Sequence, residues 1–228
     1  MAGRRLVFVV VLAVALPAVA QAATCSDNGP APTFDVAVKD PPVTYDYNAD
    51  TAILAKIAGE NAVPGLGKGQ TPFGLTVGRY DLEIIVDTDT VRAGAGAGAG
   101  TVTVTCARLR AAHVVIGLKQ LDVLVDRRFT AGSCQRNSVV AHERQHVEVF
   151  REAIRYYEPQ IEQALVASRL PKAIAVADRN EARAAYLTPL SDTLKPIFDA
   201  INGRARDGNT RLDAPASYAE VFTHCATW

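Results

Sequence analysis

The sequence predicts an α+β protein in which a strand-rich N-terminal half packs on a helical C-terminal half. Short runs rich in Val, Ile and Thr, separated by turn residues, fill residues 33–130 and are typical of strands. From Ser133 onward, apolar residues recur at helical spacings instead. The length of 228 residues and a hydrophobic content of 49% suit one globular domain. We expect a signal peptide over 1–22 and a single domain over 23–228, mainly β in 23–130, mainly α in 131–203, with a tail in 204–228.

The first 22 residues have the pattern of a secretory signal peptide. Two arginines precede the apolar run Leu6–Ala20, and Ala20-Gln21-Ala22 is a small-x-small cleavage site. That run is shorter than the roughly 20 residues that a spanning helix needs. No later stretch approaches membrane length. We therefore expect cleavage near Ala22, export to the periplasm or the extracellular space, and no stable membrane span in the mature chain.

Strands and one short helix are expected in the N-terminal half. The helix is capped by Asn48 or Asp50 and ends near Gly59, and its apolar face consists of Ile53, Leu54, Ile57 and Ala58. The Ala-Gly alternation of Ala93–Gly100 has nothing to pack and indicates the loop of a hairpin. The expected strands are Thr33–Val38, Leu82–Thr88, Thr101–Leu109, His113–Lys119 and Leu121–Phe129.

Three helical segments are expected in the C-terminal half. The first begins after Ser133 and is ended or kinked by Pro159, because proline cannot donate an intrahelical hydrogen bond. The second starts near Gln160, is interrupted by Pro171, and resumes through Tyr186. The third, Leu190–Ile201, meets a stop signal at Asn202-Gly203. The polar segment Arg204–Ser217 is expected to be a loop.

Charge and cysteine content narrow the possible functions. Lys and Arg number 24, as do Asp and Glu, so the formal net charge is zero and nothing indicates nucleic acid or an anionic membrane as a partner. The four cysteines form no CxxC pair, which favours disulfides over a metal or redox site. Of the three possible connectivities, we expect Cys106–Cys134, joining a strand to a helix entrance, and Cys25–Cys225, joining the two ends.

One motif carries chemistry. His142-Glu143-Arg144-Gln145-His146 is an HExxH sequence inside the first helical segment. Four residues are about one helical turn, so both imidazoles project from one face and can bind a single Zn²⁺ ion. Glu143 lies at the edge of that face, where it can take a proton from a metal-activated water that attacks a peptide carbonyl. The motif predicts a zinc site with Glu143 as general base.

The residues around this motif carry a family resemblance. The run Gly132–His146, preceded by strands and by Cys106, resembles the predicted secreted zinc-dependent proteases grouped as domain of unknown function 922. The Tyr45–Gly59 segment, an aromatic strand leading into a short helix, is similar too. The resemblance covers roughly residues 43–157 and implies a metallopeptidase activity. It identifies no third metal ligand.

The third ligand has several candidates. A metzincin would have a glycine and a His or Asp where this chain has Val149 and Glu152, so that arrangement is not expected. A gluzincin takes a Glu from the next helix, and the Asn180-Glu181 pair resembles the one found there. If Pro159 reverses the chain, residues near 172–176 lie opposite the histidines. We therefore expect Glu181 as the third ligand, with Asp178 and His224 as the next candidates.

These observations predict a secreted zinc metallopeptidase whose substrate is a peptide or a protein. The alternative is a non-catalytic secreted or cell-envelope binding protein, in which the histidines hold a structural metal or none. Glu143 favours the enzyme, because a purely structural zinc site does not need an unligated carboxylate at that place.

Overall fold

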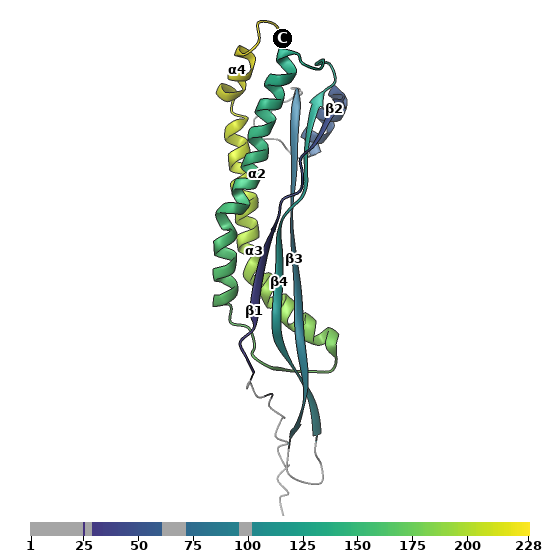
Figure 1. Cartoon of the computed structure of the whole chain (residues 1–228), viewed down its shortest axis with the longest axis vertical. Coiled ribbons are helices and arrows are strands. Elements are labelled where there is room, and N and C mark those ends of the chain that lie inside the picture. Colours follow the sequence, from purple (N-terminus) through teal and green to yellow (C-terminus); the bar gives the residue numbers. More distant parts are fainter. Residues whose placement is uncertain (1–24, 26–28, 61–71, 96–101) are drawn as a thin grey trace, which may run out of the picture.

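A computed structural model describes residue 25 and residues 29–60, 72–95 and 102–228 (Figure 1). The expected signal peptide and residues 96–100 of the Ala-Gly repeat lie outside this part of the chain. Residues 93–95, expected in the hairpin loop, instead end a strand and pair with residues 102–104. The N-terminal half forms a sheet and the C-terminal half is mainly helical, which confirms the α+β prediction. The elements are β1 (Thr33–Lys39), β2 (Thr44–Ala49), α1 (Thr51–Glu60), β3 (Gly74–Ala95), β4 (Val102–Asp126), α2 (Cys134–Ala167), β5 (Ile174–Val176), α3 (Arg179–Leu212) and α4 (Pro215–Thr223).

The long strand β4 organises the five-stranded sheet. Strand β3 runs antiparallel to it along its whole length, so the two form the expected hairpin. Three shorter strands pair one after another with the other edge of β4. Strand β5 runs antiparallel to residues 105–107 of β4, β1 runs parallel to residues 111–117, and β2 runs parallel to residues 122–126. The expected strand Leu82–Thr88 is the middle of β3.

The three strands expected between residues 101 and 129 fall largely within β4, which ends at Asp126, so the last three residues of Leu121–Phe129 lie outside the strand. The pairing with β3 skips Arg110 and Lys119, so each position is a β-bulge. A bulge adds one residue and moves the inward-facing side chains from odd to even positions, or back again. The buried residues accordingly change from Leu109 to Ala112 and from Leu118 to Leu121. The alternation breaks at these places although the strand continues.

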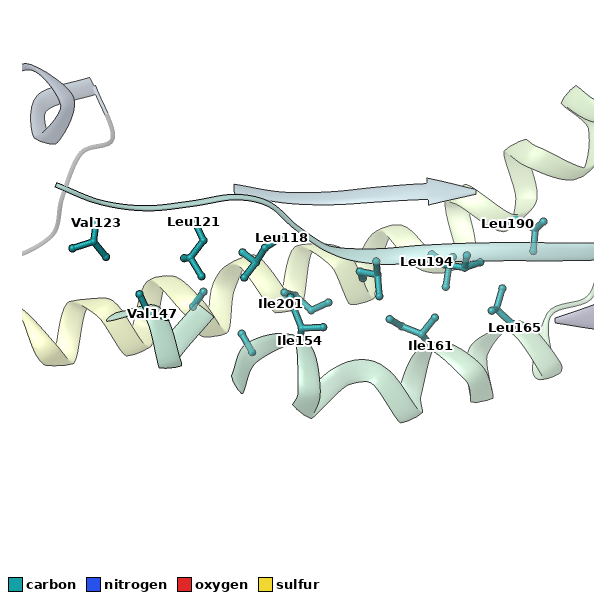
Figure 2. Packing of buried hydrophobic residues seen from close by; sticks show 14 of the residues in the cluster. Leu118, Leu121, Val123, Val147, Ile154, Ile161, Leu165, Leu190, Leu194 and Ile201 are labelled. Carbon is teal, nitrogen blue, oxygen red and sulfur yellow. The ribbon is translucent and has the colours of Figure 1, made fainter. Parts of the chain in front are cut away.

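Helices α2 and α3, of 34 residues each, lie side by side on one face of the sheet (Figure 1). Apolar side chains from both helices meet those of β4 in a single layer (Figure 2), and burying this layer supplies the main driving force for the fold. Its labelled members are Leu118, Leu121, Val123, Val147, Ile154, Ile161, Leu165, Leu190, Leu194 and Ile201.

The helix boundaries differ from the sequence prediction. Helix α2 begins where expected, with the Ser133 hydroxyl accepting a hydrogen bond from the Arg136 amide at 3.2 Å, but it continues through Pro159. Buried Ile154 and Ile161 lie on either side of the proline, and their burial offsets its cost of roughly 3 kcal/mol. The chain reverses later, after Ala167, where β5 stands in place of the expected helix.

Helix α3 likewise passes through the expected stop at Asn202-Gly203 and ends at Leu212. Ile201 and Ala205 on either side of that dipeptide are buried, so tertiary packing holds the helix together there. The expected loop Arg204–Ser217 is therefore wrong: its first nine residues are helical, and α4 begins at Pro215.

All four cysteines are paired, but not as expected. The disulfides are Cys25–Cys106 and Cys134–Cys225, with Cα–Cα distances of 5.7 and 5.8 Å. About 20 residues of extended strand, roughly 65 Å, separate Cys106 from the end of β4 that leads to Cys134, so these two cannot meet. Both bonds fit an oxidising compartment. Among the residues described, no helix has both the length and the apolar character needed to cross a membrane.

Candidate metal centre

Helix α2 brings the two histidines of the HExxH motif together. The Nε2 atoms of His142 and His146 are 3.2 Å apart, and the imidazole rings lie edge to face with centroids separated by 4.8 Å. Both side chains are buried, with about 5% of His142 exposed. One helical turn therefore presents two imidazole nitrogens at one point, as the i, i+4 spacing predicts.

The third member of the cluster is Asp213, the residue directly after α3. Its Oδ1 atom lies 3.4 Å from Nε2 of His142 and 3.1 Å from Nε2 of His146. The backbone amide of Asp213 donates to the carbonyl of Asn209, which fixes the residue at the end of the helix. Burial alone would raise the pKa of this carboxyl, but hydrogen bonds from the two histidines lower it.

These three atoms have the spacing of zinc ligands. Ligands at about 2.0–2.1 Å from a tetrahedral ion are separated from one another by roughly 3.3–3.4 Å. The observed separations of 3.1, 3.2 and 3.4 Å form one face of such a tetrahedron. Within the described ranges this is the one group of three His, Cys, Asp or Glu side chains that converges in this way. A tetrahedral ion held by these three side chains alone would have one further position for a water molecule or a substrate, as in catalytic zinc sites.

Asn209 orients His146. Its side-chain oxygen lies 3.0 Å from Nδ1 of His146, and an amide oxygen only accepts, so Nδ1 carries the proton. When the ring loses its other proton to bind a metal ion, the lone pair is at Nε2, which faces His142 and Asp213. Burial lowers the pKa of His146, but the Asp213 hydrogen bond and the nearby Glu143 carboxylate outweigh it and raise the pKa to about 9. The site thus stabilises positive charge.

Glu143 lies on the sheet side of α2. Its Oε2 atom accepts a hydrogen bond from the Thr76 hydroxyl on β3 at 2.8 Å, and the side chain is only 2% exposed. Burial raises the pKa of the Glu143 carboxyl, although His146 and the Thr76 hydrogen bond act in the opposite direction. A Cβ at Gly74 would lie 2.7 Å from Oε1 of Glu143, so only glycine lets β3 approach this closely.

The structure does not bring Glu181 or Asp178 to the histidines, which corrects the expected third ligand. Asp178 caps the start of α3, where its carboxylate accepts from the amides of Asn180 and Glu181. Glu181 accepts from the amide of Ala177 at the same end. About 30 helical residues, or roughly 45–50 Å, separate this end from Asp213. The prediction placed the reversal at Pro159 instead of after Ala167, and so chose the wrong end of α3.

His224 lies nearer the site but outside the cluster. It follows α4, its Nδ1 atom is 2.8 Å from the carbonyl oxygen of Glu220, and it lines a cleft of about 790 Å³ that also reaches His142. Sequence reasoning missed Asp213 and Asn209 because their segment was expected to be a loop. Their spacing of four residues, continuing the helix that contains Ile201, is the signal that could have found them.

Comparison of the chain with protein-family models, curated proteins and solved structures finds no match. The resemblance to domain of unknown function 922 stays a prediction based on the motif helix and its surroundings.

Proposed function

We propose that the chain is an exported zinc metallopeptidase in which His142, His146 and Asp213 hold the ion. The observation that carries the proposal is the triangle of three ligand atoms with sides of 3.1–3.4 Å, next to a buried Glu at the HExxH position. Two imidazoles and a carboxylate, with one position free, match the ligand type and number of known catalytic zinc sites. The two disulfides and the signal-peptide pattern support export to the periplasm or the extracellular space.

When bound at this site, Zn²⁺ would supply Lewis acidity, which lowers the pKa of a water molecule and polarises a peptide carbonyl. Glu143 acts as the general base: it takes the proton of the attacking water and passes it to the leaving amine. Thr76 positions the Glu143 carboxylate through its hydroxyl, and Asn209 fixes the tautomer of His146. Peptide or protein substrates are the class expected for this chemistry.

A non-catalytic binding protein with a structural metal is the second candidate. The observation in its favour is the burial of Glu143, whose carboxylate is hydrogen-bonded to Thr76. Under this alternative the metal and its ligands are unchanged, but Glu143 only joins α2 to the sheet. Metal binding alone therefore does not separate the two candidates.

The test combines metal content with peptide hydrolysis. Elemental analysis of the purified chain is expected to give one zinc per chain, and the His142→Ala, His146→Ala double variant and Asp213→Ala are expected to lose it. Glu181→Ala is the matched control and should keep full occupancy. Casein and a mixed peptide library are then assayed with and without a chelator. Zinc binding without chelator-sensitive cleavage would favour the binding protein, and full zinc occupancy in the double variant would overturn both candidates.

A further inference from the structure

A cleft leads from the surface to the candidate metal centre. It lies between the N-terminal turns of α2 and the short helix α4, has a volume of about 790 Å³, and includes His142 in its wall. The volume is within the usual range for sites that bind small molecules or side chains. Because His142 is a proposed ligand, an occupant of this cleft would lie beside a residue that would hold the ion.

The wall of the cleft combines apolar patches with a single carboxylate. Ala141, Leu212 and Val221 provide apolar surface, while Asn137, Ser138 and Gln145 are polar but uncharged. Glu220 is the one acidic residue among those that line it, and no basic Lys or Arg is among them. In the part of the chain that the structure describes, Glu220 is exposed and has no ion-pair partner.

The wall that carries Glu220 is held firmly against α2. The Cys134–Cys225 disulfide joins the segment after α4 to the first turn of α2. The Ser138 hydroxyl donates to the carbonyl of Val221 at 3.0 Å, and the Gln135 amide donates to the carbonyl of Thr227 at 2.6 Å. These bonds fix the backbone of α4, and with it the position of Glu220 in the chain, relative to the start of α2.

We propose that this cleft is a specificity pocket for a lysine or arginine side chain of the peptide substrate. The inference rests on the proposed peptidase function and adds the substrate class. Lysine and arginine have an aliphatic stem that packs on apolar surface and a charged head that needs a partner. The apolar patches suit the stem, and Glu220 supplies the only full charge, negative in sign. An acidic side chain would meet Glu220 with like charge and be rejected.

The test measures cleavage of four otherwise identical fluorogenic peptides that carry arginine, lysine, norleucine or glutamate next to the scissile bond. The wild-type chain should cleave the arginine and lysine peptides with a kcat/KM at least about tenfold above that of the norleucine peptide, as a charge-assisted hydrogen bond predicts. In Glu220→Gln, the kcat/KM values of the arginine, lysine and norleucine peptides should lie within a few-fold of one another. Glu220→Lys should favour the glutamate peptide. Glu162→Gln, an exposed residue at the other end of α2, is the matched control and should keep the preference.

A binding measurement separates failure of this inference from failure of the proposed function. N-acetyl-arginine amide and N-acetyl-norleucine amide are titrated into wild type and Glu220→Gln by calorimetry or NMR. Chelator-sensitive cleavage without a basic preference would overturn the specificity pocket and leave the peptidase standing. Arginine-selective binding that Glu220→Gln removes, without any cleavage, would retain the pocket and overturn the peptidase. Absence of both cleavage and selective binding would overturn both.

Discussion

Glu143 is the residue at which the two candidate functions diverge. Replacing it with Gln keeps the side-chain volume and an oxygen that can accept the Thr76 hydrogen bond. The amide cannot accept a proton from water, however, so Glu143→Gln should lower kcat by at least about 100-fold. Zinc content and melting temperature should stay near those of the wild type. Steady-state kinetics, elemental analysis and calorimetry on one preparation provide the measurement, with Glu162→Gln as the control.

The opposite result has a clear meaning. If Glu143→Gln retains full peptidase activity, the HExxH motif is not the catalytic element. If the wild-type chain has no peptidase activity and Glu143→Gln unfolds, Glu143 is a structural link between α2 and β3.

Asn209 allows a second test at the level of single residues. Asn209→Leu removes the acceptor of the Nδ1 proton of His146 but preserves the volume, so the imidazole is free to change tautomer or rotate. Zinc affinity should fall by roughly 10–100-fold, as is typical for partners that orient a ligand. Asn202→Leu, an exposed position on the same helix, is the matched control. Equal affinities in the two variants, measured by competition with a chromogenic chelator, would count against the orienting role.

At this scale the sequence predicts part of the candidate site. The spacing of His142, Glu143 and His146 predicts their shared helical face, because four residues make about one turn wherever a helix forms. Asp213 lies 67 residues beyond His146, and no local pattern encodes its approach. Its position depends on where the chain reverses and on the length of both helices, which are properties of the packed structure.

At the scale of elements, the close contact between α2 and α3 is what brings Asp213 to the histidines. A Cβ at Gly208 would lie 2.6 Å from Cγ1 of Val149, and a β-branched side chain has little freedom to move away. Gly208→Ala should therefore separate the helices, destabilise the fold by about 1–3 kcal/mol and weaken zinc binding. Adding Val149→Ala should restore part of the zinc affinity, because it removes the clashing methyl group.

Gly203 provides the control on the same helix. A Cβ there meets only the end of the Arg206 side chain, at 4.0 Å, so Gly203→Ala should stabilise the chain by about 0.5–1 kcal/mol through helix propensity alone. Denaturant titrations of the two variants give both values. If the two alanine substitutions have the same effect on stability and zinc affinity, the close contact at Gly208 does not position the site.

The local signals at Pro159 and at Asn202-Gly203 predicted helix ends that the structure does not have, although each residue has its usual local effect. Proline does remove a hydrogen bond, and the bulges at Arg110 and Lys119 do interrupt the alternation. These local signals do not include the free energy gained by burying the apolar layer between β4, α2 and α3. That burial keeps both helices and the strand continuous at these positions. Start signals are more dependable: Ser133 caps α2 and Asp50 accepts from Ile53 at the start of α1.

At the scale of the whole molecule, the two disulfides join parts of the chain that are far apart in sequence. Cys25–Cys106 connects the segment before β1 to β4 and β5, while Cys134–Cys225 closes the C-terminal segment over the start of α2. Sequence separations of 81 and 91 residues mean that each bond restricts the unfolded chain strongly. Peptide mapping by mass spectrometry is expected to recover these two pairs and neither of the pairs expected from the sequence.

Removing the disulfide nearest the metal centre should lower the stability of the fold but leave metal binding largely unchanged. The Cys134→Ser, Cys225→Ser double variant should lose roughly 2–5 kcal/mol of unfolding free energy. It should still bind one zinc, because Asp213 is held by the end of α3 and the histidines by α2, without help from the bond. The cleft wall formed by α4 loses its covalent anchor, so any preference among substrates should weaken while zinc content persists.

Calorimetry and elemental analysis check this together, with Cys25→Ser, Cys106→Ser as the comparison. Loss of zinc from the folded Cys134→Ser, Cys225→Ser variant alone would show instead that α4 and the bond hold Asp213 in place.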